Sequence, residues 1–500
     1  MEPIWSELQL ERMAGRTAAQ AFVEGDIPMP AGREVERILQ ADAQIQNETA
    51  RCADGRVDVD GTLALQLLCV STDGVPFDVH ASTRYNHTIP VEGAQEGMRA
   101  EVTPQLMDIR TALDNGNRAH VEAVADMNAT VQQDENMRVI TDVRNARNLE
   151  TRYEQAQLAR VRPLTGVSLR SREELEAPGV VQVLRVNAAP HIDNVTLEAN
   201  GAAVEGVMYL YALYLDDEHR LMQAMVRAPF SELIPLEMDV STCSRITAMP
   251  SVRDISGNVT TEGEALELNV TTQIEVFCIT REDINTLSDA YSADGGVNVE
   301  RQMIEQLTPV STVTGLCRIM ETLRVPEESP DVARVIFTTA RPTVLALTDN
   351  NGQLAADGIL VTAVVYADAE GNTNVFEEDI PFRCAIDAPF SPDTMVRVRP
   401  LEVRGSGVGR SVQVEYLLET QARLFERQQI MLAVDMQETE PAQRENGIYV
   451  YMANEGETPW DVGKRYGVTM EQLREWNPDL GEMFAEGTPV MILSNSGRRR

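Results

Sequence analysis

Gly61-Thr-Leu-Ala-Leu-Gln-Leu-Leu-Cys-Val70 is one of three related apolar stretches, and the other two are Gly206-Val-Met-Tyr-Leu-Tyr-Ala-Leu-Tyr-Leu215 and Gly358-Ile-Leu-Val-Thr-Ala-Val-Val-Tyr-Ala367. Each glycine follows an acidic residue. A polar turn comes thirteen positions after the glycine, an aromatic residue twenty-four positions after it and an isoleucine twenty-eight positions after it. The matching residues are Gly74, His219 and Gly371 in the turn, Tyr85, Phe230 and Phe382 as the aromatic residue, and Ile89, Ile234 and Ile386. Offsets shared by three copies identify an internal repeat.

The pattern inside each repeat predicts antiparallel β-structure. An apolar run that meets a polar turn and continues into a second run is typical of a β-hairpin. Pro229 and Pro381 directly precede the aromatic residue and indicate a strand end or an edge strand, because proline cannot donate to the ladder. Each unit also has an entry strand upstream and an alternating strand downstream. The entry strands are expected at 37–45, 183–192 and 335–344, and the alternating strands at 121–131, 266–276 and 412–422.

These patterns predict a mainly β protein, in which three antiparallel, sandwich-like β-rich domains are followed by a small βααβ domain. Met1 to Ala21 reads as an amphipathic or buried helix. The segments at 134–171 and 284–320 have mixed helical character and are expected to connect the repeats. The predicted domains are residues 1–30 (helical segment), 31–145, 146–284 and 285–436 (repeats 1, 2 and 3), 437–447 (linker) and 448–494 (C-terminal domain).

The charge balance limits the possible partners. Of the 500 residues, 43 are Lys or Arg and 78 are Asp or Glu, so the formal net charge is −35. A chain with this net charge has a negative electrostatic potential, which repels phosphate backbones and argues against nucleic acid as a partner. It favours a solvated acidic surface, with docking to a basic protein surface as the second reading. The sequence has no long uninterrupted apolar run, so neither a signal peptide nor a membrane span is expected.

The residue types that usually carry chemistry are sparse. The six cysteines are scattered without a C-x-x-C pair, at Cys52, Cys69, Cys243, Cys278, Cys317 and Cys384, which favours a reduced cytoplasmic protein with structural thiols. The five histidines all precede residue 220, and surface positions are favoured over metal ligation for His80 and His87. Motifs of hydrolases, P-loops and dinucleotide sites are missing from the sequence. We therefore expect no enzyme activity, no catalytic residue, no cofactor and no metal site.

A different pattern begins after the polar stretch at 438–447. Ile448-Tyr-Val-Tyr451 reads as a short strand, and Thr488 to Leu493 reads as a return strand. Between them, Thr458 and Thr469 are placed as N-caps of two helices, with Pro459 at the first helical position. The result is a compact βααβ pattern.

This βααβ unit resembles a LysM domain. The residues that carry the resemblance are Gly456, Thr458, Trp460, Tyr466, Gly467, Val468, Asn477 and Pro478. The resemblance implies that two loops form a ligand or partner groove, where exposed backbone can hydrogen-bond acetamide or peptide groups. The candidate groove residues are Gly456, Glu457, Thr458, Pro459, Asn477, Pro478, Asp479 and Leu480.

Two departures from the LysM pattern bear on the ligand. Pro459 stands where the family usually has leucine, and Leu493 stands where a closing proline is common. Since Pro459 falls in the groove loop, this departure argues against N-acetylglucosamine as the ligand. Trp460, Tyr466 and Trp476 are expected to pack in the core of the module rather than to contact a ligand.

The repeats resemble the SPOCS domain of clostridial sporulation proteins. The resemblance rests on Leu323-Arg-Val-Pro-Glu-Glu-Ser-Pro-Asp-Val332, on Pro229-Phe-Ser231, on Ser288-Asp-Ala-Tyr-Ser292 and on the strand that follows each acidic residue and glycine. It covers roughly residues 20–430. The first copy is the most divergent, because Arg84-Tyr85 stands where the other copies have Pro-Phe.

Together the resemblances imply a non-enzymatic structural or scaffold protein of spore-envelope (coat) assembly. Its LysM module and SPOCS repeats would dock to partner proteins, namely the ATPase of the coat basal layer or other spore coat proteins, and several repeats would add avidity. The implied location is the mother-cell cytoplasm, at the forespore or spore surface. The alternative hypothesis is a LysM-mediated binding protein for peptidoglycan or another N-acetylglucosamine glycan.

Overall fold

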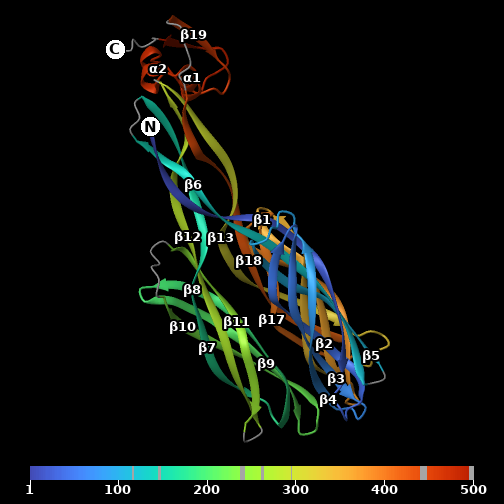
Figure 1. Cartoon of the computed structure of the whole chain (residues 1–500). Coiled ribbons are helices and arrows are strands. Elements are labelled where there is room, and N and C mark those ends of the chain that lie inside the picture. Colours follow the sequence, from blue (N-terminus) through green and yellow to red (C-terminus); the bar gives the residue numbers. More distant parts are fainter. Residues whose placement is uncertain are drawn as a thin grey trace.

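The computed structural model describes residues 1–114, 117–144, 148–236, 243–260, 264–293, 295–439 and 447–494. Within these ranges the chain forms twenty β-strands and two short α-helices. Figure 1 shows an elongated molecule, with a broad β-rich body at one end, a narrower stalk of long strands and a small C-terminal module at the other end. The protein is therefore mainly β, as the sequence predicts.

Three units with the same topology make up the body and the stalk. Each unit has six strands in two three-stranded sheets, with the sixth strand between the first and the fifth, and the third strand between the second and the fourth. Unit 1 contains β1 (Glu2–Pro28), β2 (Val35–Ala53), β3 (Arg56–Ser71), β4 (Pro76–Pro90), β5 (Arg99–Asp114) and β6 (Arg118–Arg144). Unit 2 contains β7 (Leu149–Glu176), β8 (Val180–Glu198), β9 (Gly201–Asp216), β10 (Leu221–Pro235), β11 (Cys243–Val259) and β12 (Ala265–Ser292). Unit 3 contains β13 (Gly296–Arg324), β14 (Arg334–Asn350), β15 (Gln353–Ala367), β16 (Thr373–Pro389), β17 (Met395–Val408) and β18 (Ser411–Thr439).

A glycine–aromatic pair gives the physical reason for one of the repeat offsets. The pairs that face each other in the hairpins are Gly61 and Tyr85, Gly206 and Phe230, and Gly358 and Phe382. A Cβ on Gly206 would lie 2.1 Å from the carbonyl oxygen of His191 and 2.7 Å from the Phe230 ring. Only glycine leaves room for the aromatic ring to cover the strand at this point. The same close approach exists in the other two units, so the offset reflects packing.

The sixth strand of each unit supplies its core with the predicted period of two. In β6, β12 and β18, every second side chain over the predicted alternating stretches is buried between the two sheets of the unit. Removing this apolar surface from water stabilises the folded state by about 25 cal/mol per Å². This burial holds the two sheets together. Each unit is thus a small antiparallel sandwich, in agreement with the predicted fold class.

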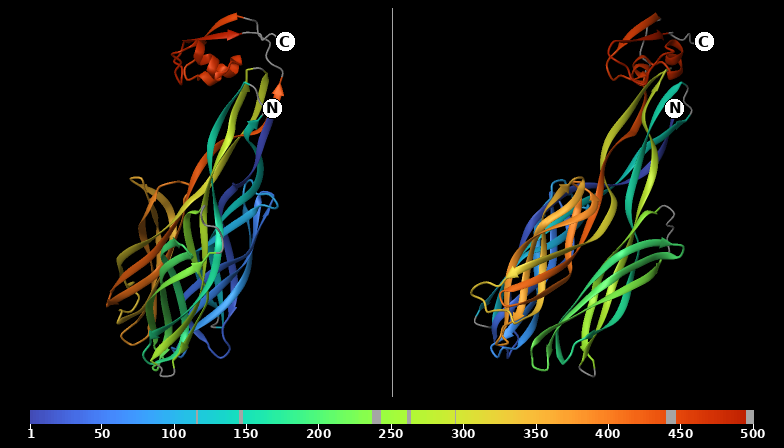
Figure 2. Two further views of the ribbon diagram at one scale, coloured as in Figure 1. Left: turned by 90° about the vertical axis from the view of Figure 1, so that its left-hand side faces the viewer. Right: turned by 180° about the vertical axis from the view of Figure 1, so that it is seen from behind.

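The first and sixth strands of each unit are long enough to leave the body and form the stalk. They pair as three two-stranded ribbons, β1 with β6, β7 with β12 and β13 with β18. All three ribbons contribute to a common apolar core, which includes Leu10, Val139, Leu158, Ile284, Ile304 and Leu432. Both views in Figure 2 show the ribbons twisting together between the body and the C-terminal module.

The bodies of the three units meet at a shared junction. Its apolar part includes Leu39, Leu184 and Ile336, which occupy corresponding positions in β2, β8 and β14. Arg185 of unit 2 is buried and forms an ion pair with Asp78 of unit 1 at 2.7 Å. Arg185 also donates to Gln40 of unit 1 at 3.1 Å, and Gln40 donates to Thr339 of unit 3 at 3.1 Å. One polar chain therefore links all three units.

The predictions of helical structure before residue 440 were wrong. The N-terminal segment is the strand β1, which pairs with β6 along its length. The described residues of 134–171 and 284–320 belong to long strands rather than to connectors of mixed helical character. The first unit therefore includes the segment 1–30, and β12 continues past the predicted boundary at 284 to Ser292. Of the predicted linker, residues 440–446 lie outside the described ranges.

The prediction of reduced thiols was wrong for four of the six cysteines. Disulfides join Cys243 to Cys278, between β11 and β12, and Cys317 to Cys384, between β13 and β16. Cys52 and Cys69 are free and buried. Because disulfides persist in oxidising surroundings, the cysteines no longer support a permanently reduced compartment. In the part of the chain that the structure describes, no helix is long and apolar enough to span a membrane.

Candidate functional site

The C-terminal module is a two-stranded sheet packed on two short helices. It consists of β19 (Gly447–Ala453), α1 (Pro459–Tyr466), α2 (Met470–Trp476) and β20 (Thr488–Ser494). Thr458 caps α1 by accepting a hydrogen bond from the Asp461 N–H, and Thr469 caps α2 by accepting one from the Gln472 N–H. Both caps, and Pro459 at the first helical position, confirm the sequence predictions.

The first loop of the candidate groove is fixed by contacts inside the module. The Gly456 N–H donates to the Phe484 carbonyl at 3.0 Å, and the Phe484 N–H donates to the Glu457 carbonyl at 2.8 Å. The Glu457 carboxylate accepts a hydrogen bond from the Asn454 N–H at 2.8 Å and pairs with Arg465 at 2.7 Å. The Asn454 N–H and the other donors lower the pKa of Glu457 to about 2. Glu457 is therefore ionised and already engaged.

The second loop is held by Asn477. The Asn477 side chain donates to the Leu473 carbonyl at 2.9 Å and to the Met491 carbonyl at 2.8 Å. It also accepts a hydrogen bond from the Met491 N–H at 2.7 Å. Asn477 therefore fastens the end of α2 to β20 and has a structural role.

The eight predicted groove residues thus differ in their availability. Glu457, Thr458 and Asn477 are engaged in bonds within the module, and Pro459 is buried. Gly456, Pro478 and Asp479 are exposed, and Leu480 packs half-buried against the module core. A ligand in this groove would therefore meet Gly456 and the Pro478–Leu480 turn, and the groove stays a prediction.

The helical side of the module rests on the end of the stalk. The Trp460 indole N–H donates to Asp289 at 3.0 Å, and the Lys464 ammonium contacts both oxygens of the same carboxylate at 2.6 and 2.7 Å. Tyr291 donates its hydroxyl hydrogen to the Val468 carbonyl at 3.1 Å, and its ring packs edge-on against Trp460 with centroids 4.9 Å apart. These contacts join α1 and the residues just after it to the last residues of β12.

Two further features show how closely the module fits the stalk. The Met470 N–H at the start of α2 donates to Glu150 of β7 at 3.0 Å. A Cβ on Gly463 would lie 2.4 Å from the Tyr291 hydroxyl, so only glycine allows α1 to approach this closely. Contacts therefore reach the module from both β7 and β12.

The docking carboxylate is buried but remains ionised. Burial acts to raise the pKa of Asp289, but hydrogen bonds from Lys464 and Trp460 outweigh it and hold the pKa below its usual value. Burial also raises the pKa of Tyr291, so this hydroxyl stays protonated and donates. A buried carboxylate with a cation and an indole donor is a specific contact, because removing any partner leaves a buried polar group unpaired.

Comparison with known families agrees with this architecture. Residues 34–114 match the family described as SipL, SPOCS domain, and residues 451–482 match the LysM domain family. The chain contains a SPOCS domain and a LysM domain. No curated protein and no solved structure matches the chain. The two domains fit a sporulation protein of the spore coat that carries a module of the glycan-binding type, and both are binding or structural rather than catalytic domain types.

The matched ranges correspond to definite structural elements. The SPOCS match begins just before β2 and ends with β5, so it covers four of the six strands of unit 1. Units 2 and 3 repeat the strand order of unit 1 but lie outside the match. That they are SPOCS repeats therefore stays a prediction. The LysM match runs from Tyr451 in β19 into the turn before β20.

Sequence reasoning missed the stalk residues that hold the LysM domain. The motif at 288–292 contributed only to the resemblance to SPOCS proteins, yet Asp289 and Tyr291 within it bind α1. Of the three aromatic residues expected in the core of the LysM domain, Tyr466 and Trp476 pack against that core, whereas Trp460 packs on Tyr291 of the stalk. A signal for this contact was present in the sequence as a conspicuous acidic and aromatic pair at the end of a repeat, without any indication of its partner.

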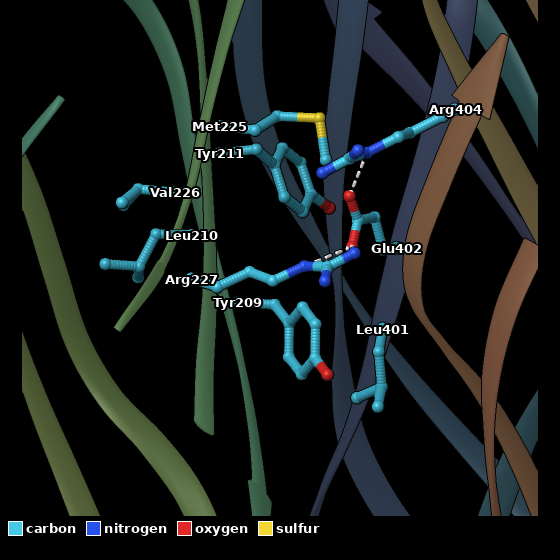
Figure 3. A pocket seen from close by; sticks show the side chains of 9 residues that line it. All are labelled: Tyr209, Leu210, Tyr211, Met225, Val226, Arg227, Leu401, Glu402 and Arg404. Atoms are coloured by element: carbon cyan, nitrogen blue, oxygen red, sulfur yellow. Dashed lines mark hydrogen bonds and ion pairs between the residues drawn. The ribbon is translucent and has the colours of Figure 1, made fainter. Parts of the chain in front are cut away.

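The body also has a small pocket between units 2 and 3. Figure 3 shows Glu402 between Arg227 and Arg404, with Tyr209 below Arg227. Arg227 donates to Glu402 at 2.8 Å, and its guanidinium lies 5.7 Å from the centre of the Tyr209 ring. The pocket volume is about 60 Å³. Its charged side chains pair with one another, so the cluster acts as an ion-pair contact between units.

Proposed function

We propose that this protein is a non-enzymatic scaffold of spore-coat assembly that docks to partner proteins through its LysM domain and its SPOCS units. The observation that carries the proposal is the anchoring of the LysM domain at the end of the stalk by Asp289 and Tyr291. Strands of all three units build the stalk, so the LysM domain is presented at the far end from the body. This arrangement suits a protein that spans a distance and joins two partners.

The body supports the same role. Its three units are joined by the buried Arg185–Asp78 ion pair, by the half-exposed Arg227–Glu402 pair and by an apolar junction, so they form a stiff platform. The net charge of −35 keeps the chain soluble and favours partners with basic surfaces. The proposed partners are the ATPase of the coat basal layer and other spore coat proteins.

The proposed location is the mother cell, at the forespore or spore surface. In this setting the two disulfides, Cys243–Cys278 and Cys317–Cys384, would close when the coat becomes exposed to oxidising surroundings after mother-cell lysis. The Cα atoms of each pair lie 5.7 Å apart, a separation at which a disulfide can close in a chain that has already folded in a reducing cytoplasm.

The alternative is that the LysM domain binds peptidoglycan or another N-acetylglucosamine glycan. The match to the LysM family and the exposed turn at Pro478 and Asp479 favour it. In the groove loop, however, Glu457 is bound by Asn454 and Arg465, and Pro459 is buried. The engaged carboxylate and the buried proline leave fewer hydrogen-bonding groups for sugar acetamides than an open loop would offer.

The deciding experiment uses the full chain with an affinity tag. It is immobilised and exposed to purified peptidoglycan, to N-acetylglucosamine oligomers and to extracts of sporulating cells, and a tagged copy is imaged during sporulation. We expect enrichment of coat proteins, no saturable glycan binding, and a signal that surrounds the forespore. Saturable glycan binding without any protein partner, or a uniform signal in sporulating cells, would falsify the scaffold proposal.

A further inference from the structure

The two faces of the LysM sheet differ in their surroundings. One face carries Tyr451, Ala453, Val490 and Ile492, which pack on the helices and form the core of the domain. The other face carries three cross-strand pairs, Ile448 with Leu493, Val450 with Met491 and Met452 with Pro489. All six of these residues are apolar. We call this second face the outer sheet face.

The outer sheet face is exposed to solvent. The exposed fractions of Ile448, Val450 and Met452 are 71%, 63% and 56%. A solvated face of an antiparallel sheet ordinarily alternates to polar side chains, and a contiguous apolar patch indicates an interaction site. Nothing in the packing of the LysM domain requires these side chains, since its core lies on the other face.

The contact with the stalk directs this face away from the molecule. Trp460 and Lys464 on α1 bind Asp289, so the helical side of the domain faces the stalk. The sheet lies on the far side of the helices from the stalk (Figures 1 and 2). The outer sheet face is therefore accessible to a large partner even while the domain is docked.

The charge of the LysM domain selects among possible occupants. Residues 447–494 contain eight acidic and three basic residues, and three arginines follow at 498–500. Two of the basic residues are already paired, Lys464 with Asp289 and Arg465 with Glu457. Glu455 and Glu486 are exposed and lie beside the end of the sheet at Met452. A second copy of the chain would bring two acidic rims together, whereas a basic rim on a different protein would be attracted.

We propose that the outer sheet face is the docking surface of the LysM domain, and that its occupant is a protein whose contact surface is apolar at the centre and basic at the rim. This proposal rests on the proposed scaffold function, because it assumes that the partner is a protein. The surface that it names is distinct from the predicted groove. Val450 lies at the centre of the face, so it is the residue whose replacement should weaken docking most.

The first test measures the chemistry of the face directly. The probe is a synthetic amphipathic helix of leucine and lysine, titrated against the full chain, with a leucine and glutamate helix as the negative probe. The variants are Val450→Asp, Pro478→Asp in the predicted groove, and Val408→Asp as the matched control, since Val408 is a 76% exposed valine in the body. All three positions are solvent-exposed, so the fold is expected to persist, and circular dichroism checks it.

We expect the Val450→Asp variant to bind the leucine–lysine helix at least about tenfold more weakly than the unmodified chain. Pro478→Asp and Val408→Asp should change the affinity by less than about twofold. Each variant adds one negative charge, which attracts the probe, so a loss confined to Val450→Asp reports the apolar contact. Raising the salt from about 0.05 M to about 0.5 M should weaken binding, because the rim charges become screened. Equal affinity for Val450→Asp and unmodified chain, or a loss confined to Pro478→Asp, would overturn the proposal.

The second test separates the face from the scaffold function. The same variants are compared for retention of each identified coat protein, and for self-association by analytical ultracentrifugation. Retention that is lost with Val450→Asp and kept with Val408→Asp supports both proposals.

If no coat protein is captured but the peptide result holds, the scaffold function fails and the docking face stands. If coat proteins are captured equally by all variants, the scaffold function stands and the docking face fails. A dimer that Val450→Asp dissolves would make a second copy the occupant and overturn the proposed partner.

Discussion

Trp460 donates its indole hydrogen to Asp289 across 3.0 Å, although the two residues are 171 positions apart. Trp460 belongs to the residues by which the LysM domain is recognised, and Asp289 lies three residues before the end of β12, one of the two longest strands of unit 2. Lys464, one helical turn after Trp460, binds the same carboxylate. One buried side chain therefore sets the position of the LysM domain on the stalk.

We expect Asp289→Asn to loosen the LysM domain from the stalk. The amide removes the charge that pairs with Lys464, and a hydrogen bond to a charged group is worth about 1.5–3 kcal/mol. The measurement is hydrogen exchange, in which residues 288–292 and 460–468 should exchange faster while the body is unchanged. The matched control is Asp331→Asn, because the Asp331–Arg410 pair is exposed and such pairs contribute about 0–1 kcal/mol. Unchanged exchange in Asp289→Asn would contradict the anchoring role.

The same contact should depend on pH in acid. The pKa of Asp289 in the folded chain lies below its ordinary value of 3.8. For a carboxyl group whose pKa is lowered by folding, the stabilisation is complete above the ordinary value and is lost as the pH falls through the lowered value. Protection of residues 460–468 should therefore be constant between about pH 5 and about pH 7, should begin to fall below about pH 4 and should be lost as the pH falls through the lowered pKa. The Asp289→Asn variant should lack this acid transition, and an identical transition in both proteins would assign it to other groups.

Gly206→Ala should destabilise unit 2. The added methyl group would lie 2.1 Å from the His191 carbonyl oxygen and 2.7 Å from the Phe230 ring, so the strands must move apart. Overpacking of this kind costs about 1–3 kcal/mol. Gly295→Ala is the control, because no atom lies within 4 Å of a Cβ placed there. Urea denaturation followed by tyrosine fluorescence and circular dichroism measures the difference, and equal midpoints would show that the glycine–aromatic pair is not constrained.

The repeat and its central strands could be predicted from the sequence because their patterns are local and uninterrupted. The N-terminal strand could not, and β-bulges give the reason. Leu8 and Leu10 are buried at even positions, whereas Ala21 and Val23 are buried at odd positions. A bulge between Met13 and Gly15 switches the alternation between them. Over the whole of β1 the buried residues therefore show no continuous period of two. The residues that favour helix then make the segment look helical in the sequence.

In the candidate site, too, contacts between residues close in sequence could be predicted, and contacts between distant residues could not. Thr458 and Thr469 cap their helices through bonds to residues three positions away, so sequence spacing suffices to find them. The partners of Asp289 and Tyr291 lie on another domain, and their contact depends on how the stalk twists and how long its strands are. A single sequence contains no information on that distance.

The cysteines provide a last prediction, which also bears on where the protein functions. Chain that has been oxidised should contain two titratable thiols after denaturation without reductant, from Cys52 and Cys69, and six after reduction. In the native state Cys69 should be unreactive toward thiol reagents at neutral pH, because burial raises its pKa to about 12. The two disulfides close loops with sequence separations of 35 and 67 residues, so each should add about 4 kcal/mol to the free energy of unfolding.

If the protein assembles in the mother cell and is oxidised after lysis, chain from intact mother cells should show six thiols and chain from released spores should show two. Six thiols in both preparations would contradict oxidation of the coat protein after lysis.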